Sequence, residues 1–64
     1  MNIKEQYKPG MKIKLINMDG EKQMKPGLIG IVDKVDDANQ IHIFWENGSS
    51  LALIPDVDEF EIID

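Results

Sequence analysis

The chain has 64 residues, no Cys and a net charge of −5, and each of its seven cationic side chains is a Lys. This length allows a single domain, residues 1–64, which buries only about 60% of the surface that its unfolded chain exposes. The composition excludes disulfides and thiolate metal sites, and no apolar run nears the ~20 residues of a membrane helix. Because the first residues also lack the apolar run of a signal peptide, we expect a soluble cytoplasmic protein without metal or cofactor.

The N-terminal part of the chain is predicted to be an arm followed by a strand. Residues 1–10 form the arm, which ends at a Pro-Gly turn. The first strand runs over residues 11–18, where apolar and polar residues alternate. Ile13 and Leu15 therefore face the core.

The second strand is separated from the first by a polar loop over residues 19–26. The strand itself spans residues 28–35, and Gly30 interrupts its apolar run. A glycine inside a strand marks a sharp bend or a close approach of another backbone. Residues 36–39 carry the short polar side chains of a turn.

The third strand begins at Gln40 and has two distinct faces. A shift of one residue would exchange the faces, so the hydrophobic pattern fixes the register. We expect the apolar set inside and the other set outside: Ile41, Ile43 and Trp45 inward, and His42, Phe44 and Glu46 outward.

A hairpin is predicted after the third strand. Asn47-Gly48 is a strong turn signal between alternating runs, and the fourth strand spans residues 49–54. A single 3₁₀ turn over residues 55–58 then leads to a last strand over residues 59–63. Phe60 and Ile62 of that strand close the fold.

These elements predict an all-β protein, a small five-stranded SH3-like barrel with a 3₁₀ turn before the last strand. A long loop after the first strand and tight turns after the second and third fit this plan. An oligonucleotide-binding barrel fits less well, because it usually spends more residues and a helix between its third and fourth strands.

Several short motifs give the chain a family resemblance that covers residues 10–63. They are Gly10 before Lys-Ile-Lys-Leu, Pro26-Gly27 and Gly30 before Val32, Asp36-Asp37, and Ile-His-Ile-Phe-Trp-Glu-Asn-Gly-Ser-Ser-Leu-Ala-Leu-Ile-Pro-Asp-Val-Asp from Ile41 to Asp58. This pattern resembles the domain-of-unknown-function family four-three-one-four. The resemblance implies a small stand-alone protein of Gram-positive bacteria, their phages or conjugative elements, with an SH3-like barrel. It brings no activity, cofactor or catalytic residue.

The sequence does not predict an enzyme or a metal site. His42 is the only histidine, and no Ser or Cys with an orienting acid is placed to work with it. The C-terminal acidic run lacks the sharp glycine turn of a calcium loop, and we interpret it as a solvated face. The run consists of Asp56, Asp58, Glu59, Glu61 and Asp64.

Our leading hypothesis is a non-enzymatic binding or adaptor module whose partner is a protein. Exposed aromatics are preferred contact anchors, so Phe44 and His42 on the sheet are the predicted contacts, with Met24 and Tyr7 at the rim. Alternatively Phe44 is covered by the arm through Tyr7, by the loop at Met24, or by a second copy in a homo-oligomer.

Two other functions stay open. Residues 1–32 carry a charge of +3 and residues 33–64 a charge of −8, so a nucleic-acid-binding barrel would use Lys12, Lys14, Lys22 and Lys25. The absence of Arg counts against it, because Arg supplies bidentate contacts to guanine and phosphate. The mobile-element setting suggests a phage counter-defence factor, either a nucleic-acid mimic or a ligand-sequestering oligomer.

Overall fold

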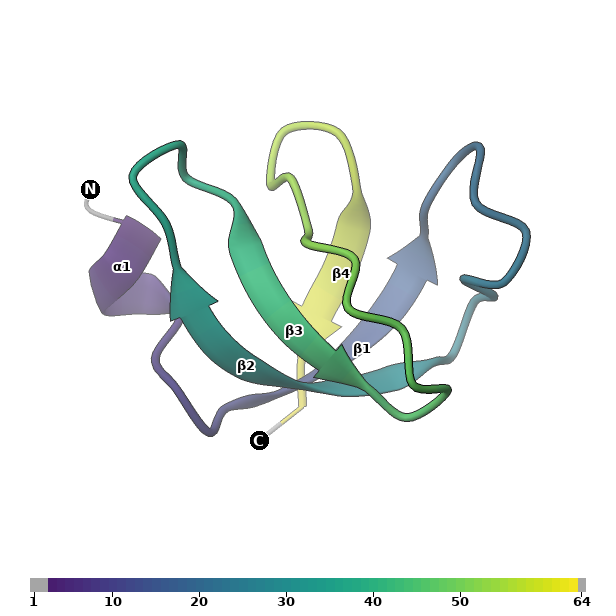
Figure 1. Cartoon of the computed structure of the whole chain (residues 1–64), viewed down its shortest axis with the longest axis horizontal. Helices are drawn as coiled ribbons and strands as arrows, with labels where there is room; N and C mark the ends of the chain where they lie inside the picture. The colour runs from purple at the N-terminus through teal and green to yellow at the C-terminus, as the bar shows by residue number, and fades with distance from the viewer. Residues whose placement is uncertain (1–2, 64) are drawn as a thin grey trace.

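The computed structural model describes residues 3–63, which form mainly one antiparallel sheet with the strand order β3-β2-β1-β4 (Figure 1). This confirms the predicted all-β class. Within residues 3–63, no helix has the length and apolar character needed to cross a membrane. The described elements are α1 (Ile3–Gln6), β1 (Lys12–Asn17), β2 (Ile29–Val35), β3 (Ile41–Trp45) and β4 (Glu59–Ile62).

The strand registers give the sheet an inner face that carries the core. Ile13 lies opposite Gly30, and Gly30 lies opposite Trp45. A Cβ on Gly30 would overlap Ile43 Cγ2 and lie 2.8 Å from Trp45 Cε3, so only glycine fits beside these side chains. Gly30 is therefore a point of close approach, and side chains of β3, not a backbone, come close to it.

The core lies between this inner face and the chain segments that cover it. Apolar residues of β1 and β3 pack against Leu53, which is fully buried, and against two methionines from the loop after β1. The predicted inward set of β3 is confirmed, because all three residues are buried. The buried residues are Ile13, Leu15, Met18, Met24, Val32, Ile41, Ile43, Trp45 and Leu53.

The predicted fourth strand, residues 49–54, is not a strand in the structure. Besides a 3.3 Å bond from Trp45 N–H to the Ser49 carbonyl at the turn, only Leu53 pairs with β3, exchanging backbone hydrogen bonds of 2.8 and 2.9 Å with Ile41. The backbone of Leu51 forms hydrogen bonds with side chains instead of with the β3 backbone. Its carbonyl accepts a 2.8 Å bond from Trp45 Nε1, and its N–H donates to Ser49 Oγ at 3.3 Å. The described strands therefore number four and leave the sheet open.

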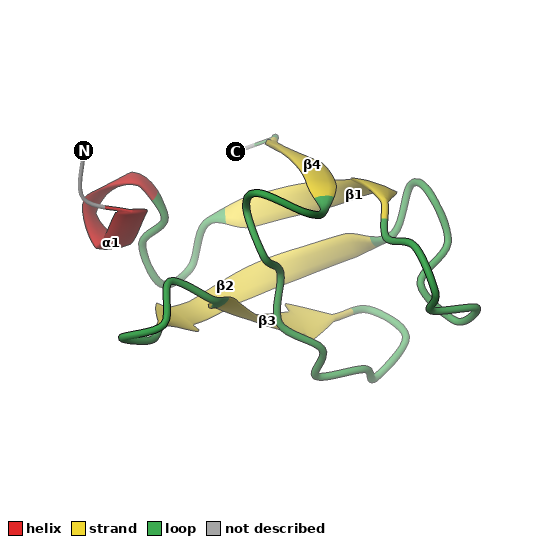
Figure 2. Ribbon diagram, turned by 90° about the horizontal axis from the view of Figure 1, so that it is seen from above, coloured by secondary structure: helices red, strands yellow, loops and turns green. Residues whose placement is uncertain are grey.

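The connection from β3 to β4 runs from one edge of the sheet to the other (Figure 2). The predicted turn at Asn47-Gly48 is shifted by one residue, because Gly48 N–H donates to the Trp45 carbonyl at 3.0 Å and Glu46 and Asn47 are the central residues. Residues 55–57 form a single turn, in which Val57 N–H donates to the Ile54 carbonyl at 2.9 Å as in a 3₁₀ turn and Asp58 N–H donates to the same carbonyl at 2.8 Å. The connection thus covers the core without adding a full strand.

The arm contains a short helix that the sequence did not predict. Tyr7 N–H closes α1 by donating to the Ile3 carbonyl at 3.1 Å. The Tyr7 ring then packs on Phe60, with ring centroids 5.5 Å apart and planes tilted by 58°. This contact joins the arm to β4.

Candidate interaction surface

The outer face of the sheet carries an exposed aromatic residue. Phe44 is 63% exposed and lies opposite Ile31, which in turn lies opposite Lys12. Ile29, two residues before Ile31 on β2, is half-buried on the same face. We call these four residues, Lys12, Ile29, Ile31 and Phe44, the outer sheet patch.

Lysines surround the outer sheet patch. Lys14 lies opposite both Ile29 and Glu61, and Lys34 lies opposite His42, next to Phe44 on β3. The other two lysines predicted to bind nucleic acid, Lys22 and Lys25, are exposed on the loop between β1 and β2 instead of the sheet. The predicted four-lysine cluster is thus divided between a strand and a loop.

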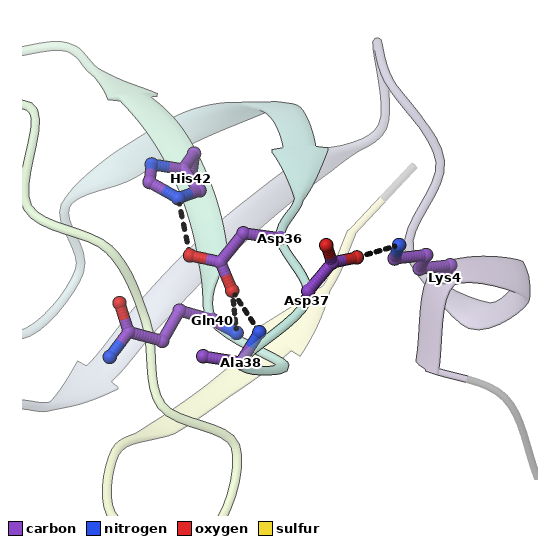
Figure 3. A network of polar contacts seen from close by, with 6 residues as sticks. All are labelled: Lys4, Asp36, Asp37, Ala38, Gln40 and His42. Carbon is purple, nitrogen blue, oxygen red and sulfur yellow. Dashed lines mark hydrogen bonds and ion pairs between the residues drawn. The ribbon is translucent and has the colours of Figure 1, made fainter.

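His42 is held by Asp36 at the turn before β3 (Figure 3). His42 Nε2 lies 2.8 Å from Asp36 Oδ2, while Asp36 Oδ1 accepts bonds from the backbone N–H groups of Ala38 and Gln40 at 2.9 and 3.0 Å. The Gln40 hydrogen bond, followed by the His42 contact, lowers the pKa of Asp36. Asp36 therefore fixes both the turn and the orientation of the His42 ring, which is half-buried.

A second ion pair in Figure 3 joins α1 to the same turn. Lys4 Nζ lies 2.9 Å from Asp37 Oδ1. This hydrogen-bonded pair raises the pKa of Lys4 and lowers the pKa of Asp37. The two adjacent aspartates thus hold different elements, Asp36 the strand β3 and Asp37 the helix.

The two predicted rim residues do not lie at the outer sheet patch. Met24 is only 3% exposed, because the β1–β2 loop folds back and inserts it into the core. Asn47 supports this loop by donating to the Gln23 carbonyl at 3.1 Å. Tyr7 is half-buried against Phe60, opposite Leu15 on the inner face. Placing Met24 at an exposed rim was therefore wrong, and neither residue covers Phe44.

The acidic C-terminal run is divided among different roles. Asp58 Oδ2 accepts a 2.9 Å bond from Ile54 N–H, and Glu59 and Glu61 are exposed on β4. Asp64, the last member of the run, lies outside the described residues. Within residues 3–63, no group of three acidic or histidine side chains is arranged to hold a metal ion.

Comparison with known proteins gives one match. A family model described as "Domain of unknown function (DUF4314)" matches residues 1–63. This is the family that the sequence motifs resemble. No curated protein and no solved structure matches the chain.

Proposed function

The chain belongs to the family Domain of unknown function (DUF4314), and from this starting point we propose that it is a non-enzymatic binding module whose partner is a protein. The observation that carries the proposal is the exposure of Phe44, which is 63% exposed on strand β3 of the sheet. Its neighbour Ile31 extends the apolar surface. The outer sheet patch is the contact surface.

The chemistry of the outer sheet patch suits a protein contact. Large aromatics are preferred anchors at interfaces, and a contiguous exposed apolar patch usually marks an interaction site. Lys12 and Lys34 border Phe44 and Ile31 on neighbouring strands. A partner with acidic residues around an apolar pocket would complement them, and the charges would steer its approach.

The scaffold that we propose for this module is an SH3-like barrel. The order of elements supports it: a long loop after β1, a tight turn before β3, and a turn at residues 55–57 before β4. Residues 49–54 lie where the fourth strand of such a barrel would be, and they pair with β3 at Leu53. Such a scaffold holds the outer sheet patch rigid, which lowers the entropy lost on binding.

A nucleic-acid partner is the second candidate, and one observation favours it. Lys12, Lys14 and Lys34 lie on the two strands beside β3, and a base can stack on the exposed Phe44 ring while Lys contacts phosphate. The net charge of −5 opposes it. Its signature is an affinity that falls steeply as salt rises.

The proposal is tested by comparing the full chain with Phe44→Ala as immobilised baits for a cell lysate. Phe44→Ala should lose the specifically retained protein. Ile62→Ala is the matched control, because Ile62 is 44% exposed and lies opposite Ile13, on the inner face. It should retain the partner.

Thermal unfolding of both variants checks that each is folded under the conditions of the retention experiment. Phe44→Ala should cost about 1 kcal/mol or less, because most of the ring is already in water. Equal retention by all three baits would refute the proposal. Retention that disappears on nuclease treatment would favour the nucleic-acid candidate instead.

A further inference from the structure

A cleft of about 270 Å³ lies away from the outer sheet patch, between the β1–β2 loop and the connection from β3 to β4. Its apolar walls come from Met18, Leu51, Ile54 and Val57. Val57 is 69% exposed and Ile54 40%, so these walls leave apolar surface in water. The volume is below the roughly 300–1,000 Å³ typical of small-molecule pockets, and suits one or two side chains of a longer ligand.

The rim of the cleft is acidic. Asp19 and Glu21 stand on the loop, and Asp58 stands on the opposite side. Within the part of the chain that the structure describes, the ion pairs involve Asp36 and Asp37 and none of these three carboxylates. A cationic side chain would complement this rim.

The backbone beside the cleft has an open edge. Leu53 exchanges both of its backbone hydrogen bonds with Ile41 of β3, and its neighbour Ala52 lines the cleft. Across residues 3–63, no hydrogen bond involves the backbone of Ser50 or Ala52. Two N–H donors and two C=O acceptors of this segment therefore lack a partner within the described residues and can bind an added chain.

We propose that this cleft binds an extended polypeptide segment in which Lys or Arg alternates with apolar residues, added as a strand along Ser50 and Ala52. Main-chain hydrogen bonds to such an edge supply affinity, and side-chain pockets supply specificity. Alternate side chains of an extended segment point the same way, so one set enters the apolar cleft while the other contacts the acidic rim. This is a second interaction surface, independent of the outer sheet patch.

The experiment uses the full ¹⁵N-labelled chain and a short synthetic peptide of alternating Val and Lys. Binding should shift the amide signals of Ser50, Ala52 and Val57 and slow hydrogen exchange at Ser50 and Ala52. The matched peptide of alternating Val and Glu should not bind. A Val-Lys peptide N-methylated along one edge should bind at least tenfold more weakly, because it cannot donate to the open carbonyls.

Two charge-neutralising variants complete the test. Glu21→Gln should weaken binding of the Val-Lys peptide roughly two- to fivefold. Glu5→Gln makes the same charge change on α1, at the opposite end of the molecule from the β1–β2 loop, and should leave binding unchanged (Figure 1).

Four results would each overturn the inference. They are equal binding of the Lys and Glu peptides, no effect of N-methylation, shifts confined to the outer sheet patch, and self-association of the free chain that protects Ser50 and Ala52. The last would make a second copy the occupant. Because the signals of Phe44 and Ala52 report the two surfaces separately, failure here leaves the outer sheet patch untouched.

Discussion

Replacing Gly30 with Ala tests how tightly the inner face of the sheet is packed. The backbone of Gly30 lies outside the left-handed region, so Ala can adopt the same conformation. Because Ala has less conformational entropy than Gly in the unfolded chain, this effect taken alone would stabilise the protein by about 0.4–1 kcal/mol. The new methyl group, however, would overlap Ile43 Cγ2 and lie 2.8 Å from Trp45 Cε3, well inside the 3.4 Å at which ordinary contact begins.

Overpacking of this kind costs about 1–3 kcal/mol, which outweighs the entropic gain. The free energy of unfolding of a domain is ~0.05–0.15 kcal/mol per residue, which gives roughly 3–10 kcal/mol for a chain of this size. The expected loss is therefore a large share of the total stability. Urea unfolding followed by far-UV circular dichroism measures it. Trp45 fluorescence supplies a second probe, because Trp45 is the only tryptophan.

A double-mutant cycle with Ile43→Ala identifies the cause. That change removes the methyl group that the new Cβ overlaps, so Gly30→Ala should cost at least ~1 kcal/mol less in its presence. The wild type, the two single variants and the double variant are all measured in the same concentration of sucrose, which stabilises the folded state so that each unfolding transition can be followed. A Gly30→Ala loss below ~0.5 kcal/mol, or strict additivity of the two changes, would show that the packing reasoning is wrong.

Three further predictions concern the turns and the connection to β4. The pKa of Asp36 is lowered in the folded chain, so its charge stabilises the fold above the ordinary aspartate pKa of ~3.9 and this contribution is lost as the pH falls through the lowered value. Thermal unfolding across acid pH should therefore show a flatter decline for Asp36→Asn than for the wild type, and parallel declines would contradict this. Asn39 has a φ of 62°, so Asn39→Val should cost about 1–2 kcal/mol in urea unfolding while Asn39→Gly costs little; equal losses would argue against strain. Trp45→Phe removes the bond to the Leu51 carbonyl and should cost about 1–3 kcal/mol, with faster amide exchange at Leu53. Unchanged exchange would mean that the indole does not anchor the connection.

The sequence predicted the buried side chains best in segments where apolar residues recur at every second position. In β3 the inward residues Ile41, Ile43 and Trp45 are all buried, because one buried face specifies the register. The same alternation at residues 49–54 predicted a strand, but the ladder of hydrogen bonds that a strand needs does not form there. There the Leu51 carbonyl accepts a hydrogen bond from the Trp45 indole instead of from the β3 backbone, a contact that no local sequence pattern contains.

The candidate contacts were predictable to different degrees. Phe44 points outward simply because its two neighbours on β3 point inward. The pairing of His42 with Asp36 requires both a turn and a side-chain orientation, and the only local signal was an aspartate at the turn and a histidine shortly after it. Met24 stands alone in a polar loop without periodicity, so its burial could be learned only from the folded chain.

Strand β4 and the segment 49–54 differ in how they meet another chain. β4 is an edge strand of four residues in which Glu59 and Glu61 alternate with apolar side chains, and short, charged edges discourage pairing with other molecules. Residues 49–54 carry no charge. A copy that added its acidic β4 to this segment would bring like charge to the acidic residues beside it, so head-to-tail growth of the chain into a fibre through these two edges is disfavoured.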